Sequence, residues 1–373
     1  MQPTVLILAK GIVPDPGGIE TYSDQVAQAY SALGFDVTVI SCFHGPRGCS
    51  RRRSARIVNV GAGRQAMVFV RMVRAAIRYR MSQTTPTFIH ATTWRAAVPA
   101  LMLFPRVPLV ISVHGREVTE MSPVVVVLMR LVFRAATRVL AISRTTLEAA
   151  TLRIPGLSSK AIVSWNGVGS SAETTSPEQR VTKSTTETCH ILTVCRLVPR
   201  KNVEGVLRAL AVLNETGCTA WNYSIAGGGP DYEHLVRTRD DLGLRNKVRF
   251  RGTVTDQQLV DLYRSADIFV HPQTSGRTGR DIEGFGLAIA DAMAWGLPVI
   301  VGRDGAPGEY ISHGITGYVV NGADFNEIAT TLKFLIQNRD VCTSVGRAAA
   351  EWVNTNLTWT RHVNNLVEAL GLT

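Results

Sequence analysis

Short apolar runs alternate with segments of helical periodicity along almost the whole chain. In the first half, the apolar runs predict buried strands at residues 5–9, 35–41, 88–91, 109–115, 138–143 and 161–168. Residues 17–34 have the spacing of a helix and end at Gly34, a common helix terminator. Because continuous apolar strands separated by helices need cover on both faces, this pattern favours an α/β fold with a parallel sheet.

The same alternation returns in the second half, after a polar interval. Residues 169–187 are rich in Ser and Thr and nearly free of large apolar side chains, which predicts a linker. We therefore expect one domain over 1–168, a second over 188–350, and a C-terminal helix over 351–373. The repeated βα units favour two Rossmann-like domains facing each other across a cleft, with the C-terminal helix crossing back to the first domain.

Composition places the chain among globular proteins and away from membrane-spanning ones. Hydrophobic residues make up 45% of the 373 residues and charged residues only 18%, which excludes a disordered chain. The apolar run after Met1 is too short for a signal peptide, and no stretch approaches the roughly 20 apolar residues of a membrane span. The six cysteines form no CxxC pair, so we expect free thiols in a reducing cytoplasm.

The net charge of +11 arises entirely in the first half of the chain. Residues 1–165 contain 20 Lys and Arg against 7 Asp and Glu, whereas residues 166–373 contain 20 against 22. Such asymmetry indicates an anionic partner, which is nucleic acid, acidic lipid or an acidic substrate. Two segments carry much of the excess: 64–81, with Arg71, Arg74 and Arg78, and 122–141, with Arg130, Arg134 and Arg138.

These two basic segments place arginines at helical spacing beside apolar residues. The pattern is typical of helices that lie on an anionic membrane surface, although a core-packed helix with a solvated arginine edge has the same spacing. Nucleic-acid binding is less favoured, because the segments lack interleaved aromatic residues and no known nucleic-acid module occurs. We therefore expect peripheral contact with an anionic membrane and no nucleic-acid partner.

Three turns after predicted strands are candidates for binding a phosphorylated ligand. Gly17 and Gly18 open a helix, where backbone amides and the helix N-terminus attract phosphate, although the spacing is not GxGxxG and an ordinary βα turn would look alike. Arg196 and Lys201 follow a strand at the edge where parallel sheets bind ligands, although they could equally be solvated. Val254 precedes a helix cap, where a base edge would meet the backbone.

The segment EGFGLAIAD, residues 283–291, joins two carboxylates through a glycine turn. Gly284 and Gly286 keep the turn open, so Glu283 belongs to the loop and Asp291 to the second turn of the following helix. The two acids are therefore suited to hold two hydroxyl-bearing parts of one ligand. Asp281 and Glu283 resemble a DxD metal motif, but no other hard oxygen ligands cluster nearby, and we expect no metal.

Taken together, these motifs resemble the retaining GT-B glycosyltransferases of family 4, also described as glycosyl transferases group 1. The resemblance extends over nearly the whole chain, is most specific in the second half, and implies the GT-B fold. Its motifs are PGGIETY, SVHGRE, AISRTT and WNGV, followed by CRLVPRKN, AGGGPDYEHL, RGTVTDQQL, LYRSADIFVHP, EGFGLAIADAMAWGLPVI and HGITGYVV.

The resemblance implies a role for each candidate residue. Glu283 resembles the acid that faces the donor sugar hydroxyls, and Asp291 the acid that binds the nucleotide ribose, where the family has Glu. Arg196 and Lys201 resemble the pair that holds the donor diphosphate, and Val254 the residue that reads the base. His114 matches the histidine near the reacting carbon, so the candidate catalytic residues are His114 and Glu283. The amides that would cradle diphosphate and sugar belong to Gly17, Gly18, Gly284, Phe285, Gly286 and Leu287.

The implied reaction transfers a mannose-, rhamnose- or glucose-like sugar from a GDP- or UDP-sugar, with retained anomeric configuration and without a metal ion. The expected acceptor is a glycan or a lipid-linked molecule in bacterial surface polysaccharide, lipopolysaccharide or glycolipid assembly, at the cytoplasmic face of the cell membrane. No side-chain nucleophile is evident, so front-side attack with the departing phosphate as base is the expected chemistry. The alternatives are a sugar-nucleotide epimerase of the same fold and, least favoured, a basic nucleic-acid-binding protein.

Overall fold

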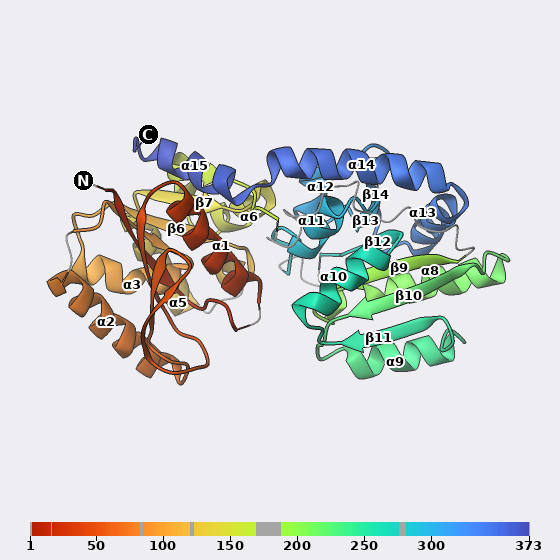
Figure 1. Ribbon diagram of the computed structural model, residues 1–373, viewed down its shortest axis with the longest axis horizontal. Helices are drawn as coiled ribbons and strands as arrows, with labels where there is room; N and C mark the ends of the chain where they lie inside the picture. Colours follow the sequence, from red (N-terminus) through yellow and green to blue (C-terminus); the bar gives the residue numbers. More distant parts are fainter. Residues whose placement is uncertain are drawn as a thin grey trace. The chain divides into compact units, whose positions relative to one another are not determined.

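The computed structural model describes residues 2–15, 17–82, 85–119, 123–168, 188–275 and 281–372. The chain divides into two compact units, each an α/β unit built on its own sheet (Figure 1). The first unit comprises Met1–Gly167 and Thr358–Thr373, and the second comprises Val168–Leu357. The predicted linker, 169–187, lies outside the described residues.

The first unit contains an eight-stranded sheet with the order β3-β4-β2-β1-β5-β6-β7-β8. Neighbouring strands are parallel, except that β3 and β4 form an antiparallel hairpin at one edge. The strands are β1 (Thr4–Ala9), β2 (Asp36–Ser41), β3 (Gly48–Arg52), β4 (Ala55–Asn59), β5 (Phe88–Ala91), β6 (Leu109–Val113), β7 (Arg138–Ala141) and β8 (Ala161–Val163). The helices are α1 (Gly18–Ala32), α2 (Gln65–Ser82), α3 (Trp94–Leu103), α4 (Arg116–Thr119), α5 (Pro123–Ala135), α6 (Arg144–Thr151) and α15 (Trp359–Ala369), with a 3₁₀ turn at Leu157–Lys160.

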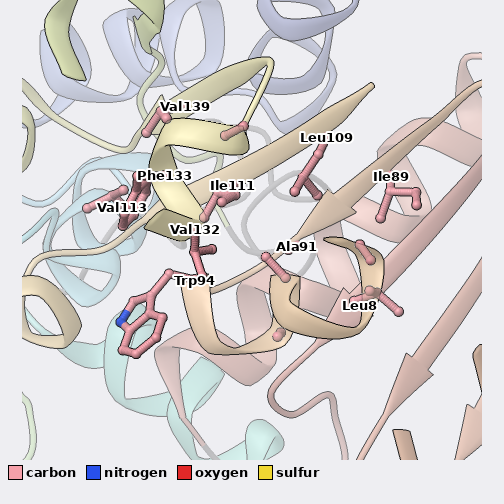
Figure 2. Packing of buried hydrophobic residues seen from close by; sticks show 14 of the residues in the cluster. Leu8, Ile89, Ala91, Trp94, Leu109, Ile111, Val113, Val132, Phe133 and Val139 are labelled. Carbon is pink, nitrogen blue, oxygen red and sulfur yellow. The ribbon is translucent and has the colours of Figure 1, made fainter. Parts of the chain in front are cut away.

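Helices cover both faces of this sheet because successive strand residues point in opposite directions. Figure 2 shows the core on one face, where Ile89 of β5 and Ile111 of β6 join Trp94 of α3 and Phe133 of α5 in one cluster. The next residue of β5, His90, points to the other face, where the Tyr30 ring of α1 lies 5.8 Å from its ring. The predicted parallel sheet with two covered faces is therefore confirmed for this half.

The second unit contains a six-stranded parallel sheet with the order β11-β10-β9-β12-β13-β14. The strands are β9 (Cys189–Val194), β10 (Trp221–Ala226), β11 (Val248–Gly252), β12 (Ile268–His271), β13 (Val299–Gly302) and β14 (Tyr318–Val320). The helices are α8 (Val203–Glu215), α9 (Tyr232–Asp241), α10 (Asp256–Ser265), α11 (Leu287–Ala294), α12 (Pro307–Tyr310), α13 (Phe325–Gln337) and α14 (Arg339–Asn356), with a 3₁₀ turn at Pro199–Lys201. Two Rossmann-like units are the architecture that the sequence predicts.

The C-terminal segment is two helices, so the prediction of one helix over 351–373 is wrong. The predicted boundary falls inside α14, and the chain leaves the helix at Leu357. Thr358 then caps α15, because its side chain accepts a hydrogen bond from the Arg361 amide. Helix α15 belongs to the first unit, where Arg138 donates a hydrogen bond to the Ala369 carbonyl at 3.2 Å.

The two basic segments are only partly helical. Residues 65–82 form α2 as predicted, but the second segment ends its helix at Ala135. Arg138 therefore lies on β7 and not on a basic helix, because the run from Arg138 continues as a buried strand. Arg71 turns inward, where its Nη1 donates to the Gly61 carbonyl at 3.4 Å. Within the described residues, no helix is both long enough and apolar enough to cross a membrane.

Candidate active site

Two loops of the second unit bring a carboxylate and two cations together. Strands β9 and β12 are neighbours, and the loop after each strand leaves the sheet at its carboxyl edge. The buried Glu283 side chain accepts a hydrogen bond from Arg200 Nη1 at 2.7 Å and another from Lys201 Nζ, both at its Oε2. Arg200 Nε also lies 3.0 Å from Asp281 Oδ1. The edge where parallel sheets bind ligands therefore carries a compact ionic cluster.

The cluster keeps Glu283 ionised. Burial raises the pKa of this carboxyl, but the positive charges of Lys201 and Arg200 outweigh burial and hold the pKa far below its usual range. Burial and the charge of Lys201 lower the pKa of His271, at the end of β12, to about 4. At neutral pH the site therefore contains a charged carboxylate, two cations and a neutral imidazole.

The glycine turn after Glu283 is fixed by its neighbours. Gly286 adopts φ 85° at the start of α11, and a Cβ there would lie 2.8 Å from Ile289 Cδ1. Phe285 is buried, and its carbonyl accepts a hydrogen bond from Tyr310 at 2.9 Å. The Glu283 carbonyl accepts from the Ala306 amide at 2.9 Å. Gly284 and Leu287 thus lie in a rigid segment that leads into the amides at the N-terminus of α11.

Asp291 lies on α11 and is half-buried. Burial and the negative charges of Glu283 and Asp291 raise the pKa of the Tyr310 hydroxyl. Both predicted acids are therefore close enough to Tyr310 to act on the same side chain.

Arg196 and Val254 are placed at the same edge of the sheet but are less enclosed. Arg196 is exposed and, among the described residues, has no carboxylate within ion-pair distance. Val254 is half-buried between β11 and Thr255, which caps α10. The sequence analysis singled out Arg196 and missed Arg200. The run PRK already contained the signal, because a 3₁₀ turn over Pro199–Lys201 presents adjacent cations together.

In the first unit, His114 follows β6 and is fixed from both ends. Its amide donates to Glu117 Oε1 at 2.5 Å, and its Nε2 lies 2.9 Å from the Thr92 carbonyl oxygen. Because a carbonyl only accepts, Nε2 carries the hydrogen of the neutral ring and Nδ1 keeps its lone pair. Burial lowers the pKa of His114 despite the nearby Glu117, so the ring is neutral at pH 7.

Gly17 and Gly18 form the start of α1. Gly17 adopts φ 151°, and a Cβ there would clash with the Glu20 carboxylate, which folds back over the turn. The turn therefore already attracts an anionic group to the helix N-terminus. Tyr22, one turn further along α1, places its ring 4.6 Å from the His114 ring.

Two sequence profiles together match the chain from residue 16 to residue 352. The profile described as "Glycosyl transferases group 1" matches residues 176–352, and the profile described as "Glycosyltransferase Family 4" matches residues 16–169. The chain belongs to glycosyltransferase family 4 and has the GT-B fold.

Relatives and solved structures agree with this assignment. This glycosyltransferase is 34% identical over 169 residues to the GDP-mannose-dependent alpha-(1-6)-phosphatidylinositol monomannoside mannosyltransferase of Mycobacterium tuberculosis, a match that covers 45% of this chain and 44% of that one. It is 30% identical over 174 residues to the D-inositol 3-phosphate glycosyltransferase of Mycolicibacterium smegmatis, covering 47% and 38%. The matched stretch therefore spans less than half the length of these curated relatives.

Two solved structures share the fold over the whole chain. The Anabaena protein HepE, crystallised with UDP and glucose, superposes with a TM-score of 0.78 at 19% identity, covering 100% of both chains. Sucrose-phosphate synthase from Thermosynechococcus elongatus gives a TM-score of 0.78 at 17% identity, covering 100% of this chain and 98% of that one. At these identities the likeness of the glycosyltransferase to both proteins concerns the fold.

A buried chain of polar side chains, which the sequence analysis did not find, lies beside His114 in the glycosyltransferase. Tyr30 OH bonds to His90 Nδ1 at 3.0 Å, and His90 Nε2 bonds to Ser112 Oγ at 2.6 Å. Ser112 Oγ lies 2.7 Å from Tyr22 OH, which lies 3.0 Å from His362 Nε2 of α15. All five side chains are buried, so helices α1 and α15 and strands β5 and β6 are held in one arrangement around His114.

Proposed function

We propose that this glycosyltransferase moves a hexose, with mannose the first candidate, from a nucleoside diphosphate donor to a lipid-linked acceptor, with retained configuration. The observation that carries the proposal is the cluster of Glu283 with Arg200 and Lys201 at the carboxyl edge of the second sheet. The named activity of the mycobacterial relatives, GDP-mannose-dependent transfer to a phosphatidylinositol monomannoside, supports mannose and a lipid acceptor. The UDP bound to HepE keeps a UDP-sugar as the second donor candidate.

The charges of the cluster suit a departing diphosphate. Glu283 and Asp281 already neutralise most of the charge of Arg200 and Lys201, whereas Arg196 has no carboxylate partner among the described residues. Arg196 is therefore the cation that a donor diphosphate would recruit first, with Lys201 behind it. Fixed cations and helix amides stabilise the leaving group without rearrangement, which is the largest contribution in many transferases.

The remaining roles follow from protonation and position. Ionised Glu283 is a hydrogen-bond acceptor for hydroxyls of the donor sugar, and Asp291 for the ribose. Val254 is proposed to meet the base. The neutral His114 ring, with its free Nδ1 lone pair, is proposed to support positive charge at the reacting carbon, and the Gly17–Gly18 turn to bind acceptor or phosphate. The departing phosphate takes the acceptor proton in front-side attack.

The outer surface of three helices in the first unit supports contact with an anionic membrane. Helix α3 contacts both α2 and α5, and all three helices belong to the first unit (Figure 1). Among their described side chains, these helices expose nine large apolar ones: Met67, Phe69, Val70, Ile77, Met81, Met102, Val127, Leu128 and Leu131. The exposed arginines of these helices are Arg74, Arg78, Arg80, Arg95, Arg130 and Arg134 among the described side chains. Apolar side chains ringed by arginines favour a lipid surface, and we propose that the enzyme works at the cytoplasmic face of the membrane.

A donor panel and a product analysis test the reaction. The protein is incubated with GDP-mannose, UDP-glucose and related donors and a detergent-solubilised bacterial phosphoinositide fraction, and the glycolipid product is analysed by NMR for its anomeric configuration. We expect α-linked mannose from GDP-mannose, and a fall in kcat of at least about 100-fold for Lys201→Met. The matched control is Lys247→Met, in the same unit but away from the cluster. No transfer from any nucleotide sugar, an epimerised donor as product, or a Lys201→Met variant within twofold of wild type would overturn the proposal.

A further inference from the structure

Residues 37–116 contain thirteen arginines but no lysine, aspartate or glutamate. Five of these arginines lie on or beside the β3–β4 hairpin: Arg47, Arg51, Arg52, Arg53 and Arg56. Arginine differs from lysine in its planar fork of five N–H donors, which matches the oxygens of a phosphate. An arginine-only, acid-free hairpin at the edge of a sheet therefore points to a phosphate-bearing partner.

The register of the hairpin sets two arginines directly opposite each other. Arg51 of β3 pairs with Arg56 of β4, so both side chains project from the same face of the hairpin. Like charges at opposed positions destabilise a strand pair unless an anion lies between them. Both residues are exposed, and within the part of the chain that the structure describes neither has a carboxylate at ion-pair distance. The hydrogen bond shown for Arg56 runs from its Nε to Cys49 Sγ, at 3.1 Å.

Arg52, the neighbouring arginine of the hairpin, has a structural role and has protein partners. It projects from the opposite face, where its Nη1 donates to the Val13 carbonyl at 2.8 Å and lies 3.6 Å from Asp24 Oδ1. The chain thus provides a partner for the arginine that anchors the hairpin to α1. The facing pair receives none of this, so its charge is directed to solvent or to a ligand.

The facing pair lies on the side of the sheet that carries α2. Val58, two residues after Arg56 and therefore on the same face, packs against the core that α2 forms. The pKa of Tyr79 on α2 is raised by burial and by Asp36 and is lowered by Arg56, so Arg56 lies beside this helix. Asp36, whose charge also acts on Tyr79, makes no ion pair with Arg56 among the described residues. The pair therefore lies on the sheet face that α2 covers, and the outer face of α2 carries exposed apolar side chains.

The turn of the hairpin also retains an arginine at a conformational cost. Arg53 adopts φ 51°, in the left-handed region that Gly or Asn would occupy more easily in a two-residue hairpin turn. Arg53 is exposed and adds a third positive charge beyond the facing pair. The turn therefore gives up local stability and gains a cation.

We propose that Arg51 and Arg56 together bind one phosphate group of an anionic membrane lipid. The proposal rests on the membrane contact proposed above, and it adds a specific headgroup site at the edge of the apolar surface. A phosphodiester has two free oxygens, one for each guanidinium, and removes the repulsion between the facing arginines. The neighbouring apolar side chains of α2 favour a lipid over a soluble phosphate, and the absence of aromatic residues in 47–56 disfavours nucleic acid.

The test compares binding to vesicles for two charge-matched variants. The hairpin variant is Arg51→Gln with Arg56→Gln, and the control is Arg245→Gln with Arg249→Gln, two exposed arginines of the second unit. The vesicles contain phosphatidylcholine alone or with about 20 mole per cent phosphatidylinositol, which makes the surface anionic. Each arginine near such a surface contributes about fivefold, so the hairpin variant should bind anionic vesicles about 25-fold more weakly. The control should remain within about twofold of wild type, since its arginines lie on another unit.

The outcomes separate this site from the two earlier proposals. A hairpin variant that binds like the control overturns the headgroup site and leaves the membrane contact standing, whereas a wild-type protein that ignores anionic vesicles overturns both. Release by inorganic phosphate at constant ionic strength, or equal arginine-dependent retention on duplex DNA, would assign the pair to another ligand. Hydrolysis of the nucleotide-sugar donor by the variant, measured without lipid, should equal wild type. An unchanged or raised melting temperature confirms that the variant folds, because the substitutions remove a repulsive pair.

Discussion

The ionic cluster at Glu283 predicts a coupling energy that a double-mutant cycle can measure. The variants are Glu283→Gln and Arg200→Met, alone and combined, which remove charge and retain most of the side-chain volume. The side chains of Arg200 and Glu283 are 19% and 9% exposed, and their atoms lie 2.7 Å apart. Hydrogen bonds to charged groups contribute about 1.5–3 kcal/mol, and Lys201 remains as a second partner of Glu283, so we expect a coupling of about 2 kcal/mol at pH 7.

The assay must report on the second unit alone, because a chain of two units need not unfold in one step. Hydrogen exchange of peptides from residues 188–275 and 281–357 gives the opening free energy of that unit. The matched control is the more exposed pair Glu204–Arg208 on α8, at 2.7 Å, for which about 0.3–0.5 kcal/mol is expected. A coupling for Glu283 and Arg200 no larger than that of the control would refute the view that burial strengthens this pair.

Four further predictions concern Glu283, Arg196, Gly286 and Tyr22. The folded-state pKa of Glu283 is depressed, so the stability that this carboxylate contributes is complete above its unfolded pKa of about 4.3 and is lost as the pH falls below that value. The advantage of wild type over Glu283→Gln in opening free energy, measured by hydrogen exchange, should therefore shrink on acidification. A difference that stays constant with pH would contradict this. Arg196→Ala should leave the stability unchanged within about 0.5 kcal/mol and weaken GDP-mannose binding about tenfold or more by calorimetry, and an unaltered affinity counts against its role. Gly286→Ala should destabilise the second unit by about 2 kcal/mol, whereas the control Gly243→Ala should cost about 1 kcal/mol. The Cβ at position 286 would lie 2.8 Å from Ile289 Cδ1, whereas the Cβ at position 243 would meet no atom within 4 Å. Equal shifts in thermal unfolding for the two variants would contradict the steric argument. Tyr22→Phe leaves two buried polar groups short of a partner, so exchange protection should fall by about 1–3 kcal/mol in the first unit and stay unchanged in the second.

Most strands of both sheets were predictable, because continuous apolar runs mark them as buried. Every apolar run of the first half, for example 5–9 or 109–115, contains a strand of the parallel sheet. The β3–β4 hairpin was not predictable in the same way. All five residues of β3 are exposed, so the segment Gly48–Arg52 has no apolar alternation to mark it as a strand.

The site was predictable as a set of loops but not as a set of contacts. The sequence pattern located Glu283, Lys201 and the glycine turn, because these lie where strands end and helices begin. It assigned Arg196 and Lys201 to the donor diphosphate and missed Arg200, which pairs with Glu283. The contact of Arg200 with Glu283 joins residues more than eighty positions apart in the chain, which only the folded sheet brings together.

The prediction of a single C-terminal helix was wrong for a related reason. Residues 338–371 have helical spacing throughout, and the break at Leu357 and Thr358 depends on a short capping interaction. Arg138 was assigned to a helix by its spacing from Arg134, although the apolar residues after it form β7. In both places the helical spacing was correct over a few residues, but the prediction extended the helix beyond its true end.

The docking of α15 on the first unit has a consequence for the order in which the enzyme is made. Its buried His362 joins Tyr22, and Gly167 leaves no room for a side chain because the Trp359 backbone and ring lie against it. The first unit therefore leaves the ribosome without its last helix, which follows about 190 residues later. At about 5–20 residues per second this delay is about 10–40 seconds, during which Tyr22 of α1 lacks its hydrogen-bond partner His362. The second unit is continuous in sequence, so it is complete before the first unit, although its synthesis begins later.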